Sequence, residues 1–394
     1  MIGRSVLVVG CGIAGPAVAY WLMEHGFSAT IVERASGPRA GGYVIDLWGK
    51  GYDLVERMGL LAEVKRASVP LNEVRLVGPR GKREGGFDAR VFREATGGRY
   101  ASLARSDLSS ILYDAVAPRV RTLWGDEPIS FEQRAQGVWV EFRHAEPELF
   151  GLVVGADGLH SSVRQRVFGD SSRFERFLGF TVAAFETAGY PHRDEGVYVS
   201  FGSPGCQVAR FALPNDRTLF LVVVTDDVAP TQALEQSAAR QYLEGKLGGG
   251  AWELRQILQA LGRSEHVYFD RVSQIHMPRW SRGAIALLGD AAYAPSLLGG
   301  QGAALAVIGA YVLAGELSHA VAPESAFERY QDTLRGFVYG KQEAAAKLAN
   351  SFAPSSRLGI WLRNMATRTF AIPGVAKTLL GRQLDDKLEL RTYA

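Results

Sequence analysis

The chain has 394 residues, of which 47% are hydrophobic and 22% are charged, and its net charge is +3 at pH 7. This length exceeds one simple core and favours two closely packed domains, and the composition is that of an ordinary folded protein. The small net charge and the lack of basic runs interleaved with aromatic residues argue against nucleic acid as a partner.

The two cysteines, Cys11 and Cys206, show no CxxC pattern and no metal-type spacing. This usage is typical of a reducing compartment, and it predicts neither disulfides nor a metal site. No apolar stretch reaches the length of a membrane span without glycine, proline or charge, and no cleavage site follows the apolar N-terminal stretch. We therefore expect a soluble, cytoplasmic protein.

The first predicted elements form a βαβ unit: a strand over 5–9, a helix ending at His25 and a strand over 29–33. The turn between the first strand and the helix reads GCGIAG. In such a GxGxxG turn, the glycines allow a tight bend, close approach of a pyrophosphate, and packing of helix on strand. The pyrophosphate would rest on the helix N-terminus, and Glu33 would accept hydrogen bonds from an adenosine ribose. The unit predicts a dinucleotide site.

Residues 71–101 are rich in glycine and in short apolar alternation, which predicts short antiparallel strands. Ser106 is the predicted N-cap of the helix that follows Arg105. The other elements predicted before residue 150 are a loop over 35–40, a stretch GGYVIDL over 41–47, helices over 52–58 and 107–117, and strands over 120–123 and 138–142.

Residues 152–164 repeat the opening theme, with an apolar strand that ends in Gly-Ala-Asp-Gly before a helix. From 177 to 225 the pattern is β-rich without crossover helices, which predicts an antiparallel sheet. Residues 231–261 are helical by pattern, and 267–276 returns as a strand.

The stretch GDAAYAPSLLGGQG over 289–302 places an acid and a glycine-rich turn between an apolar strand and a small-residue helix over 303–317. Three separated turns that each combine glycine with an acid need one extended ligand. A dinucleotide with a tricyclic ring is long enough, and Asp290 would bind its ribityl hydroxyls. The small residues leave room for a flat ring beside helix N–H groups.

These three motifs resemble those of the class A, para-hydroxybenzoate hydroxylase-like flavoprotein monooxygenases. The match is to the compact branch that includes tetracycline-inactivating and antibiotic-tailoring monooxygenases, and it covers most of residues 5–320. The resemblance implies FAD as cofactor. The cofactor-binding residues are then Gly10, Gly12, Ile13, Ala14, Gly15, Glu33, Arg34, Gly42, Asp46, Arg105, Asp157, Asp290, Gly300, Gln301 and Gly302. For Arg105 and Asp46 the alternative is a surface ion pair.

The resemblance implies an α/β fold with a Rossmann-like FAD-binding domain, an interleaved antiparallel substrate domain and a C-terminal helix. We expect the FAD-binding domain at 1–70, 102–175 and 277–350, the substrate domain at 71–101 and 176–276, and a helical segment at 351–394.

The implied reaction is hydride transfer from NADH or NADPH to FAD, then insertion of one oxygen atom from O2 through a flavin C4a-hydroperoxide. Hydroxylation, epoxidation and Baeyer-Villiger oxidation stay open, and the substrate is expected to be hydrophobic, aromatic or polyketide-like. The alternatives are a flavin-dependent reductase or dehydrogenase of an isoprenoid or polyketide, and an FAD-binding protein without turnover. Either a monomer or a homodimer is compatible with the sequence.

The antiparallel sheet is expected to cover the flavin ring with apolar side chains, but alternation alone cannot say which face points inward. The candidate substrate residues are Phe201, Gln207, Arg210, Phe211, Phe220 and Pro295. His192, His266 and His276 are possible acid-base helpers, and no catalytic residue is assigned. The chain departs from the family where His, Asn and Asp are frequent, at Tyr293, Ala304 and Gly309.

Residues 357–382 combine five basic and no acidic residues with apolar ones. Such a stretch could lie on an anionic lipid surface. A C-terminal helix packed across both domains is the favoured interpretation.

Overall fold

The computed structural model describes residues 3–38, 41–226, 236–248, 250–371 and 388–393. Its first layer is a six-stranded sheet in the order β17-β18-β11-β1-β2-β7, in which every neighbouring pair except β17 and β18 is parallel. The strands are β1 (Ser5–Val9), β2 (Ser28–Glu33), β7 (Arg121–Trp124), β11 (Leu152–Gly155), β17 (Ser281–Arg282) and β18 (Ile285–Leu287). Their apolar residues are buried on both faces, as a parallel sheet between helices requires.

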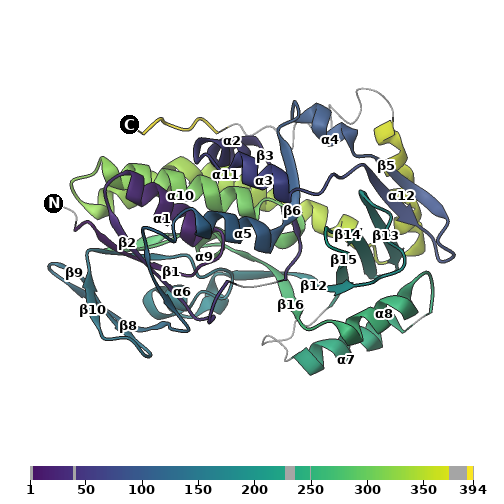
Figure 1. Ribbon diagram of the computed structural model, residues 1–394, viewed down its shortest axis with the longest axis horizontal. Coiled ribbons are helices and arrows are strands. Elements are labelled where there is room, and N and C mark those ends of the chain that lie inside the picture. The colour runs from purple at the N-terminus through teal and green to yellow at the C-terminus, as the bar shows by residue number, and fades with distance from the viewer. Residues whose placement is uncertain (1–2, 39–40, 227–235, 249, 372–387, 394) are drawn as a thin grey trace.

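Helices cover this sheet (Figure 1). Almost every residue of α10 is buried, so this helix of small and apolar residues lies inside the core rather than on the surface. The helices of this half are α1 (Ala14–Glu24), α2 (Gly49–Arg57), α3 (Leu61–Ala67), α5 (Arg105–Asp114), α6 (Ser162–Phe168), α9 (Asp290–Tyr293), α10 (Gly302–Ser318) and α11 (Pro323–Phe352).

A seven-stranded sheet in the order β16-β12-β15-β14-β13-β4-β5 forms the other half of the molecule. It comprises β4 (Glu73–Val77), β5 (Arg83–Asp88), β12 (Glu175–Ala188), β13 (Val197–Ser203), β14 (Cys206–Ala212), β15 (Arg217–Thr225) and β16 (Val267–Ile275). The prediction of an antiparallel sheet holds for every pair but one, because β13 and β4 run parallel. The β4–β5 hairpin reaches this sheet from far upstream, which local patterns cannot show.

The two faces of the seven-stranded sheet have different partners. One face packs against α7 (Gln236–Leu247) and α8 (Leu254–Arg263) through one apolar cluster. The opposite face meets β3 (Val44–Trp48) and the end of α11 through two smaller clusters. Figure 1 shows α7 and α8 below this sheet and α12 (Arg357–Arg368) beside it.

Two small sheets complete the architecture. β3 pairs antiparallel with β6 (Tyr100–Ala104), and β8 (Pro128–Arg134), β9 (Gly137–Phe142) and β10 (Glu148–Phe150) form a three-stranded sheet. The prediction of strands throughout 71–101 is wrong for α4 (Arg90–Ala95). The short 3-10 turns are Ser171–Arg173, Leu297–Gly299 (η2) and Thr369–Ala371.

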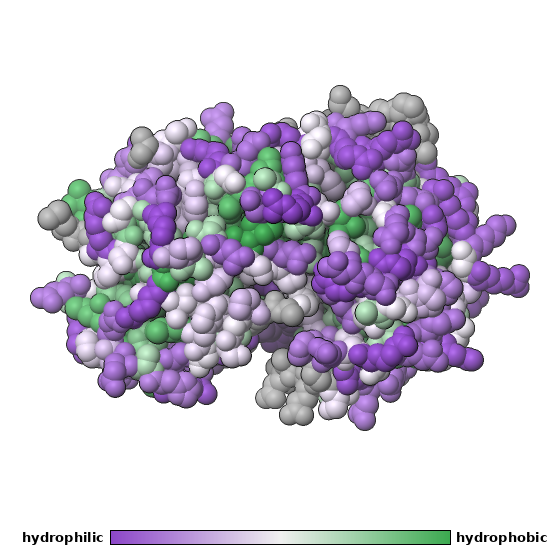
Figure 2. Space-filling model, in the orientation of Figure 1, coloured by the Kyte–Doolittle hydropathy of each residue, from purple (hydrophilic) through white to green (hydrophobic). Residues whose placement is uncertain are grey.

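α12 lies on β5 and buries Ile360 and Asn364, while Leu358 and Trp361 remain 65% and 57% exposed. The residues 372–382 of the stretch considered for lipid binding lie outside the described part of the chain. The molecular face in Figure 2 is mainly hydrophilic, with scattered hydrophobic areas. None of the described helices is long and apolar enough to cross a bilayer.

Candidate functional site

The turn between β1 and α1 uses its three glycines in three ways. Gly10 has a φ of +104°, and a Cβ there would lie 2.6 Å from the carbonyl oxygen of Ala156. A Cβ on Gly15 would lie 1.9 Å from the carbonyl oxygen of Gly10. A Cβ on Gly12 would meet only a guanidinium nitrogen of Arg105, at 3.6 Å. The first and third glycines therefore close the turn, and the second faces open space.

Helix α1 begins beside this open space at Ala14, and its N-cap residue Ile13 makes no side-chain cap. The first turn of the helix contains no acidic residue. Backbone N–H groups at such a helix start form a ready site for an anion. The Gly12 side of the turn thus fits a phosphate group.

Glu33 ends β2 next to the same turn. Its buried carboxylate accepts hydrogen bonds from the backbone N–H groups of Cys11 (2.8 Å) and Ala35 (3.0 Å). A carboxylate oxygen can accept more than one hydrogen bond, so these backbone contacts are compatible with a ribose hydroxyl as a further donor. Arg34 follows the end of β2 and is exposed.

Arg105 is placed by the meeting of β3, β6 and α5. Its backbone N–H donates to the carbonyl oxygen of Tyr43 (2.9 Å), and its Cβ lies 3.8 Å from where a Cβ of Gly42 would be. Helix α5 begins at Arg105 itself with Ala104 as N-cap, so the prediction of Ser106 as N-cap is wrong. The backbone of Ala104 is extended, so the N-cap of α5 lies two positions before Ser106. With this start of the helix, the Arg105 side chain points toward Gly12.

Asp290 begins α9 directly after Gly289, whose φ is +64°. One of its carboxylate oxygens lies 3.5 Å from where a Cβ of Gly302 would be, at the start of α10. Burial raises the pKa of Asp290, while the nearby guanidinium groups of Arg105 and Arg164 act in the opposite direction. The Asp290 carboxylate and the uncapped start of α10 thus form the second part of the site.

Asp157 caps α6. Its carboxylate accepts hydrogen bonds from the Ser161 hydroxyl (2.5 Å) and from the N–H groups of Ser162 (2.7 Å) and Val163 (3.1 Å). In the structure this residue therefore holds the turn that begins α6.

Arg164 is a contributor that the sequence analysis did not assign. This buried side chain donates to the carbonyl oxygens of Leu159 (2.6 Å) and Ala291 (2.9 Å). It therefore fixes the Asp290 segment to the turn around Asp157. Its place in the second glycine turn was the only signal in the sequence.

Several polar side chains deep in the fold still have accessible surface. Desolvation inside the fold raises the pKa of Tyr43 and of Tyr198 to about 12, and it raises the pKa of Asp46 and Asp290. All four side chains nevertheless keep part of their surface accessible to solvent. The same holds for Tyr100 and Tyr268. The Tyr43 and Tyr268 ring centroids lie 5.7 Å apart, and we infer that these partly exposed side chains border an internal space. We call the region bordered by these six residues the tyrosine-lined space.

Asp46 lies on β3 and faces this space together with Trp48. The hydroxyl of Tyr100 donates to the Asp46 carboxylate at 2.5 Å. A Cβ on Gly300 would lie 3.9 Å from the Trp48 ring, so the Gly300-Gln301-Gly302 turn adjoins the same region. The indole nitrogen of Trp48 is buried without a hydrogen-bond partner.

Two of the predicted substrate residues lie on the sheet face toward β3. Phe211 packs with Val44 and Tyr198, and the side-chain oxygen of Gln207 accepts a hydrogen bond from Arg363 (2.9 Å). Pro295 is buried, and its carbonyl oxygen accepts a hydrogen bond from Gln274 (3.0 Å).

The other three predicted substrate residues lie on the opposite face of the sheet, away from β3. Phe201 and Phe220 belong to the cluster under α7 and α8. Arg210 is paired there with Asp194 (2.6 Å) and Glu253 (2.8 Å). Side chains alternate between the two faces of the sheet, but the packing of α7 and α8 on one face decides which residues point toward β3.

Among the histidines, the one near the tyrosine-lined space is His160, which was not singled out from the sequence. Its ring nitrogen is 2.9 Å from Asp270, and Asp270 also accepts from Tyr268 (3.3 Å). His192 and His266 are exposed. His276 contacts Gln274 (3.0 Å), and burial lowers its pKa.

Tyr293 and Gly309, two of the positions at which the chain departs from the family pattern, lie next to each other in the structure. Tyr293 is buried and its hydroxyl receives a hydrogen bond from Tyr330 (3.0 Å). A Cβ on Gly309 would lie 2.1 Å from the Tyr293 hydroxyl oxygen. The glycine therefore makes room for the larger ring.

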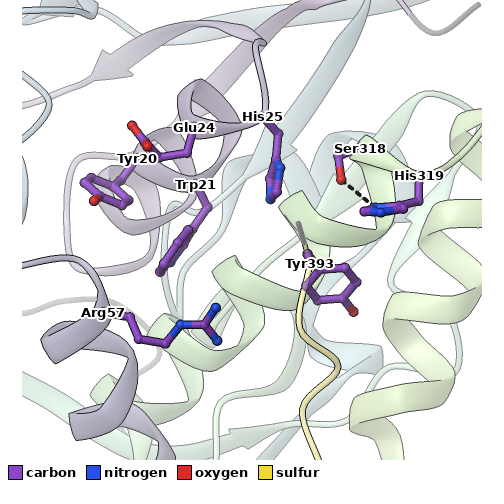
Figure 3. A pocket seen from close by; sticks show the side chains of 8 residues that line it. All are labelled: Tyr20, Trp21, Glu24, His25, Arg57, Ser318, His319 and Tyr393. Atoms are coloured by element: carbon purple, nitrogen blue, oxygen red, sulfur yellow. Dashed lines mark hydrogen bonds between the residues drawn. The ribbon is translucent and has the colours of Figure 1, made fainter.

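An open cavity of about 490 Å³ lies elsewhere, at the C-terminal end of α1 (Figure 3). Helix α1 contributes Tyr20, Trp21, Glu24 and His25 to it, and the others are Arg57, Ser318, His319 and Tyr393. None of the predicted site residues lines it. Because the glycine turns lie at the other end of α1, this cavity is not part of the candidate site.

Comparison with known proteins agrees with this geometry. Residues 4–338 match the family model described as "FAD binding domain". An uncharacterised protein of Mycobacterium tuberculosis (strain CDC 1551 / Oshkosh) is 36% identical over 86% of this chain and 92% of its own length. A flavin-dependent monooxygenase of Legionella longbeachae is 33% identical over 88% of this chain and 89% of its own. The tetracycline destructase Tet(51), for which there is a crystal structure, is 29% identical in sequence. The structural match covers 100% of both chains and has a TM-score of 0.84.

Proposed function

On the premise that this chain belongs to the FAD-binding-domain family of flavin-dependent monooxygenases, we propose that it inserts one oxygen atom from O2 into an aromatic or polyketide-like substrate. NADH or NADPH is the proposed reductant. One observation carries this proposal: three turns that are far apart in sequence meet beside the tyrosine-lined space. They contain Gly12, Asp157 and Asp290.

The residues fit FAD. Gly12 leaves backbone open to a pyrophosphate, Glu33 lies beside this turn as an acceptor for a ribose hydroxyl, and Asp290 faces the start of α10 where ribityl hydroxyls would lie. Bound FAD would supply the electron transfer from nicotinamide to O2. Arg105 would add positive charge beside the pyrophosphate, and Arg164 would hold the Asp290 segment in place.

The tyrosine-lined space is proposed to hold the substrate and to keep water from the reacting atoms. Its walls combine aromatic rings with a few polar groups, which is typical of a site for a hydrophobic molecule with polar substituents. Tyr100 and Asp46 are placed to bind a substrate hydroxyl, and Phe211 packs in the wall beside Tyr198. The similarity to Tet(51) supports tetracycline as the first compound to test. The chain contains only two cysteines and no CxxC pattern, which supports the proposal of a cytoplasmic location.

The test uses the purified full chain, with FAD content measured by absorbance. The expected result is bound FAD, O2 uptake with NADH or NADPH that rises with a substrate, and a product that carries one ¹⁸O atom from ¹⁸O2. Reduction of the flavin with transfer of hydrogen to substrate and no O2 uptake would indicate a reductase instead. A protein that binds FAD but is never reduced would indicate a role without turnover.

A further inference from the structure

The outer face of α12 carries an apolar stripe. It consists of Leu358, Trp361, Leu362 and Met365, which are 65%, 57%, 54% and 39% exposed. Their spacing of three, one and three residues places all four side chains on one side of the helix, over a length of about 10 Å. They are four of the eight large apolar residues that are exposed in the described part of the chain. Such a concentration on one surface marks a place where a partner binds.

The packing of α12 on β5, the last strand of the seven-stranded sheet, keeps this stripe facing outward (Figure 1). The helix lies so close to the strand that a Cβ on Gly85 would be 2.7 Å from the carbonyl oxygen of Asn364. The side chain of Asn364 donates to the carboxylate of Glu84 (3.3 Å), and the N–H of Gly86 donates to the hydroxyl of Thr367 (3.0 Å). Turning the stripe toward the sheet would break these contacts, so the apolar side chains stay on the surface.

The charges around the stripe are positive. Residues 357–371 contain three arginines and no acidic residue. Arg357 and Arg368 are exposed, and the helical period places both on the same flank of the stripe. The turn between β4 and β5, at the end of the strand on which α12 lies, adds the exposed cations Arg80 and Lys82. The surface therefore combines an apolar centre with a cationic edge.

We propose that α12 docks on the surface of an anionic phospholipid bilayer. The stripe would enter the boundary between headgroups and acyl chains, where an indole ring such as that of Trp361 is favoured, and Arg357 and Arg368 would face lipid phosphates. The charges disfavour a second copy of the chain as the partner, because its α12 would bring only further cations to this surface. The inference goes beyond the proposed function and does not depend on it, because the docking involves neither the glycine turns nor the tyrosine-lined space.

The test is sedimentation of the full chain with vesicles of phosphatidylcholine, either alone or mixed with an equal amount of phosphatidylglycerol. The expected result is binding at least tenfold stronger to the mixed vesicles, which added salt weakens. The double variant Trp361→Gln, Leu362→Gln should bind these vesicles at least tenfold more weakly. Its FAD content and thermal midpoint should match the wild type, because both side chains are exposed. Arg357→Gln should weaken binding to the mixed vesicles about fivefold, the effect of one cation near an anionic surface.

Val321→Gln is the matched control, because it replaces a side chain that is 85% exposed, between α10 and α11, and should leave vesicle binding unchanged. The inference is wrong if the wild-type chain does not sediment with the mixed vesicles, or if the double variant sediments as well as the wild type. A wild-type dimer that the double variant converts to monomers, measured by light scattering, would assign the stripe to a second copy instead. FAD content and O2 uptake of the same preparations decide the proposed function separately.

Discussion

Two glycines of the turn between β1 and α1 have different roles: Gly12 is expected to matter for cofactor binding, and Gly15 for folding. In Gly12→Ala, the added Cβ meets only Arg105, so the apoprotein is expected to keep its thermal midpoint. FAD affinity should fall at least tenfold, because the methyl group occupies the approach to the pyrophosphate. Fluorescence titration with FAD measures this loss.

Gly15→Ala is the matched comparison. Its Cβ would lie 1.9 Å from the carbonyl oxygen of Gly10, so it should lower the yield of folded protein before any effect on FAD can be measured. If both variants fold alike and bind FAD alike, the roles given to the two glycines are wrong.

Asp46 makes stability depend on pH in a defined direction. Burial raises its pKa above the ordinary value of 3.8, so the folded state holds this proton more tightly than the unfolded state. As the pH rises from about 3.8 through the folded-state pKa, the wild-type apoprotein should lose unfolding free energy relative to Asp46→Asn. The loss should be about 1.4 kcal/mol for each pH unit that separates the folded-state pKa from the unfolded-state pKa. Urea unfolding at a series of pH values gives the difference, which should be flat above this range. A constant difference at every pH would contradict the raised pKa.

The exposed glycines of α11 offer a test at the scale of a helix. Gly336 and Gly340 lie inside Pro323–Phe352, and in the described part of the chain a Cβ built on either meets nothing within 4 Å beyond its chain neighbours and the backbone of the helix itself. Replacing each with alanine reduces the freedom of the unfolded chain without a clash, so each should add about 0.5 to 1 kcal/mol of stability. The midpoint of urea unfolding should rise while FAD content stays the same. A fall would show that one of these positions contacts something that the structure does not contain.

The elements that carry the cofactor motifs were largely predictable from the sequence. Residues 5–33 and 284–317 combine uninterrupted apolar strands with glycine turns, and these short-range signals determine where strand, turn and helix begin. The β4–β5 hairpin and the face occupied by Phe201 were not predictable. Each depends on contacts between segments far apart in the chain, such as α12 lying on β5. Alternation predicts two faces, but long-range packing decides which one is inward.

At the scale of the whole molecule, the described C-terminal residues lie against α10. The ring of Tyr393 occupies the place where Gly315 has no side chain, since a Cβ there would lie 2.2 Å from the ring. Its hydroxyl donates to Glu316 (2.8 Å). Gly315→Ala should displace this segment and lower stability by about 2 kcal/mol, the worth of one buried side chain.

Limited proteolysis with mass spectrometry would detect the displaced segment, because trypsin should then cleave at Arg391 faster than in the wild-type chain. Gly340→Ala serves as the control for a glycine replaced without a clash. Equal cleavage rates in Gly315→Ala and the wild type would show that Tyr393 finds another place on the surface.

The order of strands in the parallel sheet has a consequence for how the chain is made. β1 and β2 emerge first from the ribosome, but β11 waits for its neighbour β18 at Ile285–Leu287, and most of the seven-stranded sheet is synthesised between them. Pairings across such long loops form slowly. A nascent chain must therefore keep one apolar edge of its first sheet uncovered through more than a hundred residues of translation. We expect its yield in cells to depend on chaperones that shield this edge.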